Sequence, residues 1–480
     1  MEEDKMLGTI IKKELLNNIF SFRFLVTFVL LIVIVTVTIF ILTDDYVRKV
    51  DDYSRRQREI ENYLGKYAHF NRINNVIRPS QPPVPFYSLI RGLSSDVNIR
   101  EFDNDPLPVI FPLIDLTFIV TILLSLIALL FSYDSICGEK EDGTLKLMLS
   151  NKIPRSKIIL GKIIGGTLTL IFPFLFSLIV GLLIILLNPR VLWRGADWGA
   201  FGLIILGSIL YFTLFYCLGV FISSCHHSSS ASIMTSLFVW VLLILIIPNL
   251  SPYMASILSK TPSRIKIERE VHRLQDVERD ELGRRLAEEK RREIYKKYPF
   301  LEKRLSEAER EKRIAEDPGY KKAYLELAQE VGKAWNEANR IQRNKVSILR
   351  DDLTRKEAAQ EKLATFISMV SPLSDFTYLA TDLSSTGIRS QEHFGQIAGQ
   401  WWVAFGDYSK KKMASLREEN PAADVWNTPV DVSDRPRFQY KEEALIGRFK
   451  GTLSFFVVLI VYNFIFFIAA YFSFVRYDVR

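Results

Sequence analysis

The stretch YDSICGEKEDGTLKLMLSNKIPRSKIILGK, residues Tyr133 to Lys162, is a short and densely charged interruption between two long apolar runs. The flanking runs cover about 111–132 and 164–187 and carry almost no charge. A helical run of about 20 apolar residues is long enough to cross the hydrocarbon core of a bilayer. The charged stretch is therefore predicted to be an aqueous loop between two membrane-spanning helices.

Four further apolar runs of similar length lie at about 23–43, 200–222, 229–250 and 452–475. Strands of a membrane barrel alternate in polarity and span roughly 10 residues, so these continuous runs indicate helices. The sequence predicts an all-α polytopic protein with six transmembrane helices, an N-terminal interfacial helix and a large extracytoplasmic helical domain. The predicted order is an interfacial elbow helix at 1–22, transmembrane helix 1 at 23–43, an extracytoplasmic segment at 44–110, transmembrane helix 2 at 111–132, a cytoplasmic loop at 133–163, transmembrane helices 3 to 5 within 164–250, an extracytoplasmic stalk and cap at 251–446, and transmembrane helix 6 with a cytoplasmic tail at 447–480.

The first 22 residues show the pattern of an amphipathic helix. Their apolar side chains recur at helical spacing on one side, at Leu7, Ile11, Leu15, Ile19 and Phe22. Lysines such as Lys12 and Lys13 fall mostly on the other side, where they suit lipid headgroups. We expect this helix to lie on the membrane surface; the alternative is a frayed tail.

Charge and cysteine content exclude two other classes of protein. The net charge of +8 comes from basic residues spread over polar blocks and short loops, with no nucleic-acid-binding motif. Lys and Arg that flank membrane spans explain this charge. The three cysteines, Cys137, Cys217 and Cys225, lie outside the two long polar blocks, so those blocks have no disulfide framework.

The polar block at 262–363 consists almost entirely of charged and helix-forming residues. A heptad stripe within it requires a partner helix, and the stretch 264–297 is the expected partner. These two segments predict a stalk of antiparallel helices; the alternative is a single solvated helix. A richer content of aromatic residues, Gly and Pro predicts a compact cap over 371–441. The stripe is Tyr324, Leu327, Val331, Ala334, Ala338, Ile341 and Ile348, interrupted at Lys345, and its partner positions are Ile267, Val271, Leu274, Leu282 and Leu286.

The distribution of basic residues predicts the orientation in the membrane. Six spans place both chain ends on one side, together with the 133–163 loop and the SSCHHSS turn at 223–229. Short segments on that side are rich in Lys and Arg, whereas the short loop opposite carries only Arg190 and Arg194. Basic short loops stay in the cytoplasm. Both termini are therefore expected to be cytoplasmic, with both long polar blocks outside.

These features together resemble the membrane subunits of type-2 ABC transporters. The resemblance rests on the interfacial helix, the six spans, the loop GEKEDGTLKLMLSNKIPRSKIILGK at 138–162 and the enlarged block between spans five and six. It points to the permeases related to multi-copper-enzyme maturation, including nitrous-oxide reductase maturation. The run TFISMVSPLSDFTYLATDLSSTG at 365–387 also looks like that subgroup.

The resemblance implies a role for the loop, which in that family sits in a groove of the ATPase subunit. The implied coupling residues are Gly138, Glu139, Lys140, Glu141, Asp142, Gly143, Thr144, Leu145 and Lys146. Their residue types fit this role, because glycines permit tight turns and charges of both signs allow interface pairs. Leu145, Leu147 and Met148 add a short apolar face. From residue types alone, an ordinary charged connector explains the loop equally well.

The chain lacks a phosphate-binding loop of the form GxxxxGK[ST], and GKIIGG at 161–166 is not one. We therefore expect a subunit that is not an enzyme and binds no cofactor, with ATP and Mg²⁺ held by a partner chain. The resemblance implies two copies of an ATP-binding cassette ATPase and a second copy of this chain. It also implies a multi-pass protein in the lipid bilayer of a prokaryotic cytoplasmic membrane. A protein outside the cytoplasm is a further candidate partner, and no nucleic acid is expected.

Polar residues within the spans are candidates for a transport pathway. Ionisable residues inside a span are functional candidates by default, and Asp115 lies near one end of span two. The alternative for the hydroxyl residues is ordinary helix packing. The complete candidate set is Asp115, Thr117, Thr121 and Ser125 on span two with Ser232, Thr235, Ser236 and Asn249 on span five.

No metal site is expected, because Cys225, His226 and His227 are better explained as a solvated turn. The function that we expect is export of an unidentified substrate, driven by ATP hydrolysis in the partner chain. The rival is a mechanotransmitter that moves its extracytoplasmic domain to act on an envelope protein, with nothing crossing the membrane. Polar residues on spans two and five favour a path, whereas the long stalk favours the rival.

Overall fold

The computed structural model describes residues 2–92, 114–150, 154–302, 305–420 and 424–476. Short parts of the predicted segments lie outside these ranges: 93–110 of the first polar block, the start of span two at 111–113, and 151–153 of the loop. The same holds for 303–304 of the stalk, 421–423 of the cap and 477–480 of the tail. The chain divides into two compact units, Met1–Pro248 with Ser368–Arg480, and Asn249–Ile367.

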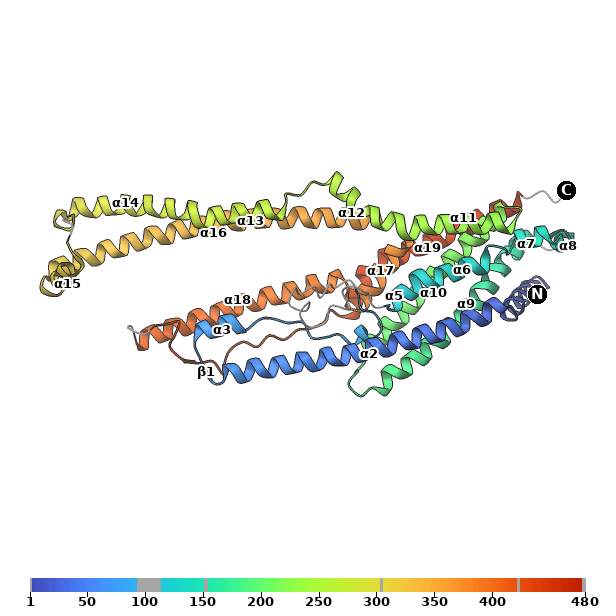
Figure 1. Cartoon of the computed structure of the whole chain (residues 1–480), viewed down its shortest axis with the longest axis horizontal. Coiled ribbons are helices and arrows are strands. Elements are labelled where there is room, and N and C mark those ends of the chain that lie inside the picture. The colour runs from blue at the N-terminus through green and yellow to red at the C-terminus, as the bar shows by residue number, and fades with distance from the viewer. Residues whose placement is uncertain (1, 93–113, 151–153, 303–304, 421–423, 477–480) are drawn as a thin grey trace. The chain divides into compact units, whose positions relative to one another are not determined.

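Six helices among the described residues are long and apolar enough to cross a membrane, which confirms the predicted all-α polytopic fold. Spans one, three, four and six are α2 (Phe22–Leu64), α9 (Arg155–Leu187), α10 (Gly195–Cys225) and α19 (Leu445–Val475) (Figure 1). Span two joins α5 (Leu116–Phe118), η3 (Ile119–Leu124) and α6 (Ser125–Ser132). Span five joins α11 (Ser229–Val241), η4 (Leu242–Ile246) and α12 (Ile247–Leu258). Both η3 and η4 are π-helical.

The N-terminal residues form α1 (Glu2–Ile19), as the amphipathic pattern predicts. Ser21 then caps α2 by accepting a hydrogen bond from the backbone N–H of Phe24. This helix continues well past the predicted span at 23–43 and ends at Leu64, before Gly65 with a φ of 60°. The polar sequence from residue 44 to residue 64 is helix-forming and contains neither proline nor glycine, so nothing in it stops the helix before Gly65.

Close helix contacts in the first unit depend on glycines of α9. A Cβ atom on Gly161 would collide with Ile10 of α1, and one on Gly165 would crowd Glu14 of the same helix. Gly166 faces the ring of Tyr216 on α10, which is fully buried. Small residues let helix backbones approach closely in a membrane. The run of glycines in GKIIGG is thus a packing face for two neighbouring helices.

Beyond the apolar run of α2, residues from the two ends of the chain form a small outer cluster. It joins the end of α2 to α3 (Phe70–Val76), α18 (Ile388–Glu419) and a two-stranded antiparallel pair, β1 (Tyr67–Ala68) with β2 (Val430–Asp431). Arg435 is buried there and bonds to Glu61 at 2.5 Å. The predicted cap at 371–441 therefore folds together with the predicted segment at 44–110. The cluster contains Leu64, Ala68, Phe70, Ile73, Trp401, Phe405, Val430 and Val432.

The second unit is an antiparallel helical hairpin, as predicted for the stalk (Figure 1). Its first arm runs through α13 (Arg264–His272), η5 (Arg273–Glu278) and α14 (Arg279–Lys297). After η6 (Pro299–Leu301) and α15 (Glu307–Glu316), α16 (Pro318–Ser368) forms the returning arm. Arg264 pairs with Glu357 at 2.7 Å, and Lys297 pairs with Glu326 at 2.6 Å. Between these two pairs the residue number increases along the first arm, from 264 to 297, and decreases along the returning arm, from 357 to 326. The two arms are therefore antiparallel.

The seam of the hairpin shifts by one position near its middle, which the heptad pattern does not predict. Ala334 and Ala338 are buried as expected, but Ile348 is 66% exposed. Val346 is buried instead, against Val271 and Leu274 of the other arm. The π-helical turn η5 lies in that facing arm and adds a residue to it. A straight helix also drifts relative to a strict heptad, so the contacting face rotates.

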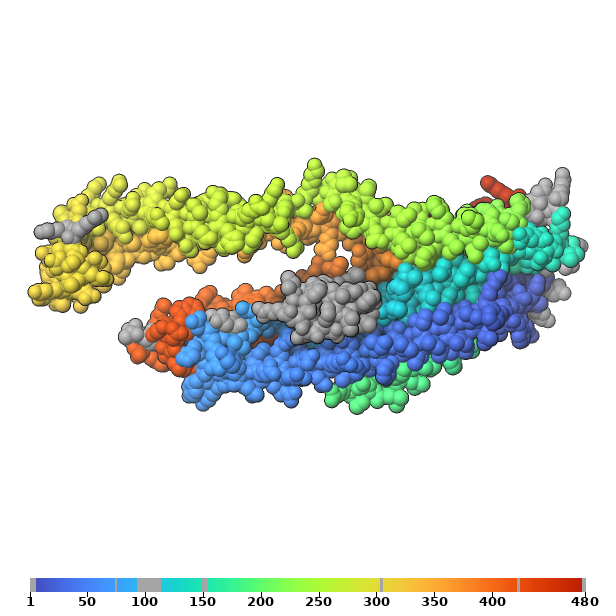
Figure 2. Space-filling model, viewed as in Figure 1, coloured from blue at the N-terminus to red at the C-terminus, as the bar shows by residue number. Residues whose placement is uncertain are grey.

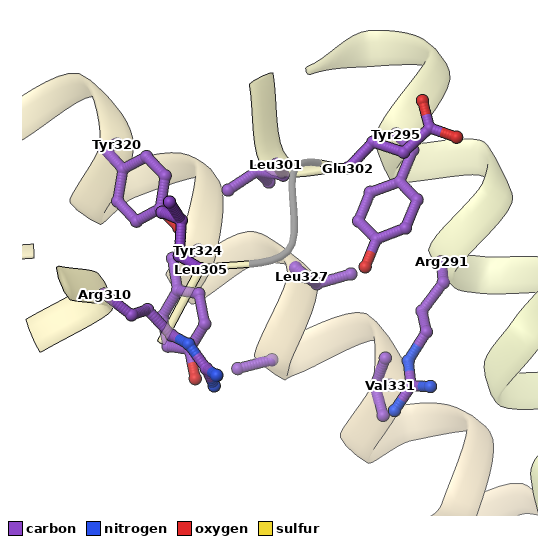
Figure 3. Close-up of a pocket in the computed structure, with 11 residues that line it drawn as sticks. Arg291, Tyr295, Leu301, Glu302, Leu305, Arg310, Tyr320, Tyr324, Leu327 and Val331 are labelled. Atoms are coloured by element: carbon purple, nitrogen blue, oxygen red, sulfur yellow. The ribbon is translucent and has the colours of Figure 1, made fainter. Parts of the chain in front are cut away.

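A pocket of about 350 Å³ lies near the closed end of the hairpin (Figure 3). Tyr295 and Arg291 line it from the first arm, and Tyr320 and Tyr324 line it from α16. The guanidinium of Arg310 on α15 lies beside Tyr324, and a hydrogen bond to that tyrosine raises the pKa of Arg310. The short helix α15 is thereby held against the returning arm.

A substitution at Gly283 can test how closely the two arms of the hairpin pack. A Cβ atom at Gly283 would collide with the indole of Trp335, so Gly283→Leu is expected to open the hairpin. Overpacking of this kind costs about 1–3 kcal/mol. Limited trypsin digestion of the full chain should cleave the variant faster within 264–363. Gly332→Leu is the matched control, since nothing lies within 4 Å of a Cβ there. Equal cleavage of the two variants would contradict this packing.

Candidate functional site

The polar segment after span two is an ordered element, which we call the connector (residues 133–150). It contains two short helices, α7 (Cys137–Glu141) and α8 (Thr144–Ser150). Gly143 joins them with a φ of 74°, in the region that glycine adopts without strain. The connector lies at the surface of one end of the first unit (Figure 2). The connector is therefore a pair of short helices and not an irregular loop.

Ser223, in the last turn of α10, holds the start of α7. Its Oγ atom accepts hydrogen bonds from the backbone N–H groups of Ile136 and Cys137, both at 3.0 Å. Ser232 of α11 donates a hydrogen bond to the carbonyl of Tyr133 at 2.6 Å. Spans four and five thus both contact the first turn of the connector.

Two adjacent connector residues bind the two sides of the turn between spans four and five. The ammonium group of Lys140 donates to the carbonyls of Ser224 and His226, at 2.6 and 3.0 Å. These carbonyls close α10, where a helix attracts a cation. The carboxylate of Glu141 accepts from the backbone N–H and the hydroxyl of Ser229, at 3.1 and 2.5 Å. That residue begins α11, where a helix attracts an anion.

A buried ion triad ties the connector to α1 and α9. Lys162 of α9 is 2% exposed, and its Nζ atom lies 2.9 Å from a carboxylate oxygen of Glu139. On its other side, Nζ lies 3.5 Å from Glu14 of α1. Removing one partner of such a buried group leaves an uncompensated charge, which costs about 3–5 kcal/mol. The triad therefore holds three elements in one arrangement.

A fourth anchor reaches span one. Arg23, in the first turn of α2, pairs with Asp134 at 2.8 Å and donates to the hydroxyl of Tyr133 at 3.1 Å. The connector is thus bonded through its own side chains to spans one, three, four and five, and Lys162 of span three links it to Glu14 of α1. The connector follows span two directly in the sequence, so it is also covalently attached to that span.

Comparisons with known proteins agree with this architecture. The family model described as ABC-2 family transporter protein matches residues 8–479 of the chain. The chain belongs to the ABC-2 family of transporter proteins. Two relatives are each named probable ABC transporter permease protein NosY. The protein from Stutzerimonas stutzeri is 34% identical over 128 residues, and the one from Pseudomonas aeruginosa is 36% identical over 132 residues.

These pairwise similarities cover only part of each ABC-2 protein. Each alignment spans 27% of this chain, and it spans 46% of the first relative and 48% of the second. The chain thus aligns with about half the length of the curated relatives that it matches.

The structure divides the predicted coupling residues of this ABC-2 chain into two groups. Glu139, Lys140 and Glu141 bond to the protein's own helices, and Leu145 is buried. Gly138 lies against Asp134 at the start of α7. The exposed group is Asp142, Gly143, Thr144 and Lys146, to which Leu147 adds a side chain that is 70% exposed. Charge types in the sequence alone do not reveal which residues face inward.

A groove of about 1020 Å³ opens beside the connector. Lys13 and Asn17 of α1 line one side, and Asp134 and Asp142 line the connector side. The buried triad forms part of its wall, since Glu14, Glu139 and Lys162 all line the groove. The groove gives an external group access to the junction between α1 and the connector.

The candidate pathway residues on span two are packed among the helices, and Asp115 forms a cap. Its carboxylate accepts from the backbone N–H of Phe118 at 2.8 Å and from that of Arg91 at 3.2 Å. Ser125 accepts from the indole N–H of Trp240 at 2.8 Å. Thr121 bonds within its own helix, and the hydroxyl of Thr117 is buried without a partner among the described residues.

The candidate residues on span five are distributed along its length. Ser232 bonds to the connector, and Thr235 lies 3.2 Å from the ring of His226. Ser236 is buried, and its hydroxyl has no partner among the described residues. Asn249 is exposed and lies in the second unit. The structure does not gather the eight predicted pathway residues into one cluster.

Other side chains of the described residues give no metal-binding arrangement, since no three of His, Cys, Asp and Glu come together there. Cys225 lies 3.3 Å from Ser473 instead. Functional candidates that the residue pattern does not indicate are Glu14, Ser223 and Ser229, which hold the connector, and Asp375 on α17 (Pro372–Leu383). Lys162 ends the quoted loop, and its position three residues before the glycine pair Gly165–Gly166 is the only local signal in the sequence.

Proposed function

We propose that this chain is the membrane permease subunit of an ATP-binding cassette transporter that exports its substrate. A separate ATPase binds ATP with Mg²⁺ and hydrolyses the ATP. The observation that carries the proposal is the seating of the connector, whose side chains bond to four membrane spans and which is linked to α1 through Lys162. A force on α7 and α8 therefore reaches these helices without passing through a flexible link.

Proposed contacts with the ATPase follow from the exposed group of the connector. Asp142, Thr144 and Lys146 face outward, and Leu147 presents an apolar side chain. An exposed apolar anchor with a polar rim is the usual composition of a binding surface. We assign this face to the ATPase and assign the group that bonds to other helices, Glu139, Lys140 and Glu141, to transmission of the movement.

The proposed orientation places the connector in the cytoplasm. The end of the first unit that holds the connector also holds α1 and the last turn of α19 (Figure 1). Arg155 at the start of α9 donates to the carbonyl of Val475 at 2.5 Å, which ties α19 to that end. Short segments there are rich in Lys and Arg, which favours a cytoplasmic location in a prokaryotic membrane.

A second copy of the chain and a second ATPase complete the proposed complex. Span five is the least covered of the six spans, with 17% of its apolar window buried. Met234 and Phe238 on this span are 73% and 69% exposed. We expect the partner copy to cover this face. The rival function, movement of an outer domain without transport, is not favoured, because the transporter family model matches nearly the whole chain.

Leu147→Asp tests the proposed ATPase contact. The change places a charge on an exposed apolar side chain and leaves the anchors of the connector intact. Loss of an apolar anchor at an interface costs about 2 kcal/mol, roughly 30-fold in affinity. Binding of the partner ATPase to the purified chain in detergent measures this loss. Leu192→Asp is the control, because Leu192 is 74% exposed on the loop between spans three and four. Equal affinity of the two variants would refute the assignment.

A further inference from the structure

The helix α17 enters the packed core of the first unit. Phe376, Leu379, Ala380 and Leu383 on this helix are all 0% exposed. Its start bonds to span five, because Ser371 donates a hydrogen bond to the carbonyl of Leu243 at 2.5 Å. Irregular or broken helices at such depth are tolerated where protein surrounds them.

The other end of α17 bonds to the beginning of span six. The guanidinium of Arg448 donates to the carbonyl of Leu383 at 2.8 Å and to the hydroxyl of Ser385 at 2.9 Å. Arg448 lies in the first turn of α19. The helix therefore runs from the middle of span five toward the connector-distal end of the spans.

Asp375, in the first turn of α17, is a carboxyl group without a partner. Its side chain is 0% exposed, and neither oxygen has a hydrogen-bond partner among the described residues. Burial of an ionised carboxylate without a partner costs so much free energy that the group takes up a proton instead. Ser371, which would normally cap the helix, uses its hydroxyl on Leu243.

No cationic side chain of the described residues compensates Asp375. Two titratable side chains lie close enough to interact electrostatically with Asp375. They are Tyr211 of span four and Tyr462 of span six. The hydroxyl of Tyr211 donates to the carbonyl of Thr121 at 3.0 Å, and that of Tyr462 donates to the carbonyl of Val370 at 3.0 Å. Both hydroxyl protons are thus directed at backbone carbonyls and not at the carboxyl group.

Oxygen atoms without partners also occur on three spans that contact α17. They are Thr117 Oγ1 on span two, Ser236 Oγ on span five and Asn463 Oδ1 on span six. Buried polar atoms are nearly always hydrogen-bonded, so the unpartnered oxygens of Asp375 and of these three spans require an explanation. Oxygen donors of this type bind ammonium groups and hard cations.

The two spans with π-helical turns meet α17 at those turns. Thr121 lies in η3 and Leu243 lies in η4, and their carbonyls accept the hydrogen bonds from Tyr211 and Ser371. Single π-helical turns inside helices occur frequently at functional sites. The π-helical turns η3 and η4 contain backbone groups that do not make the hydrogen bonds of a regular α-helix.

We propose that Asp375 is a cation-binding carboxylate on the transport path, and that it holds a proton in the arrangement described here. When a cation enters, the O–H bond of Asp375 breaks, the proton passes to water in the opened path, and the carboxylate binds the cation. The ligand class is a small cation with an affinity for oxygen, either an alkali ion or a primary ammonium group. This inference rests on the proposed export function.

Infrared difference spectroscopy of the full chain tests this site. A protonated carboxyl gives a carbonyl stretching band that an ionised carboxylate lacks, and the spectrum of the unmodified chain minus that of Asp375→Asn isolates it. We expect the band at neutral pH, and we expect it to disappear on addition of K⁺ or of methylammonium with release of a proton. The two salts are separate arms that distinguish an alkali ion from an ammonium group, with N-methylglucamine as the bulky control.

Two results would overturn the proposal: absence of the band at neutral pH, or a band that neither salt changes. Asp382→Asn is the control for assignment, since Asp382 lies on the same helix near Arg389. If Asp375→Asn does not fold, Asp375→Glu in a chain labelled with ¹³C-aspartate assigns the band, because only the replaced residue then loses the isotope shift. The measurement needs no ATPase, so a failure to bind an ATPase would contradict the proposed function and leave this result standing.

Discussion

Lys162→Met is expected to destabilise the chain by about 3–5 kcal/mol and to abolish coupling to the ATPase. The methionine keeps the length of the side chain but removes the charge that compensates two carboxylates. Glu14 and Glu139 then face each other at the same buried junction. The midpoint of thermal unfolding in detergent measures the first effect, and ATP-driven activity in liposomes measures the second.

Two further variants separate charge from packing at the triad. Lys12→Met removes an exposed lysine of α1 and should leave the midpoint unchanged. The neutral combination Glu14→Gln, Lys162→Met and Glu139→Gln should recover most of the lost stability, because no unpaired charge remains. If Lys162→Met unfolds at the same temperature as the unmodified chain, the triad does not hold the connector.

Gly166→Val is expected to prevent correct packing of spans three and four. A Cβ atom at Gly166 would collide with the hydroxyl and ring of Tyr216, which is fully buried and has no room to turn. Overpacking of a rigid site costs about 3 kcal/mol. We expect the variant to accumulate poorly in the membrane and to elute as aggregate in size-exclusion chromatography.

Gly202→Val is the matched control for this change. Gly202 lies within α10, and nothing lies within 4 Å of a Cβ at that position. The same glycine-to-valine change within a helix therefore occurs without a collision. Similar elution of the two variants would show that the approach of α9 to α10 is looser than described.

The spans and the hairpin could be predicted from sequence because their signals are long. Continuous apolar runs locate six helices, and the heptad stripe of 324–348 identifies a helix that needs a partner. The structure differs from these predictions in two places, each with a local cause. The π-helical turn η5 shifts the hairpin contacts away from Ile348, which is exposed. The absence of an early proline lets α2 continue to Leu64.

The candidate site could be located from sequence but not resolved into inward and outward residues. Four successive charged residues at 139–142 look alike as a string, yet only Asp142 makes none of the anchoring contacts described above. Their partners, such as Glu14 and Ser229, are distant in the chain, and no local pattern connects them. Asp375 could not be identified either, because nothing in the sequence around it shows that its carboxyl has no partner within the described part of the chain.

Site-specific photo-crosslinking from position 146 tests the central claim most directly. Lys146 is exposed on α8, so a photoreactive residue there should be tolerated. We expect a covalent adduct with an ATP-binding cassette ATPase in intact cells, and no such adduct from position 192 at the other end of the spans. An adduct at position 146 only with proteins outside the cytoplasm, or no ATPase adduct at all, would contradict it.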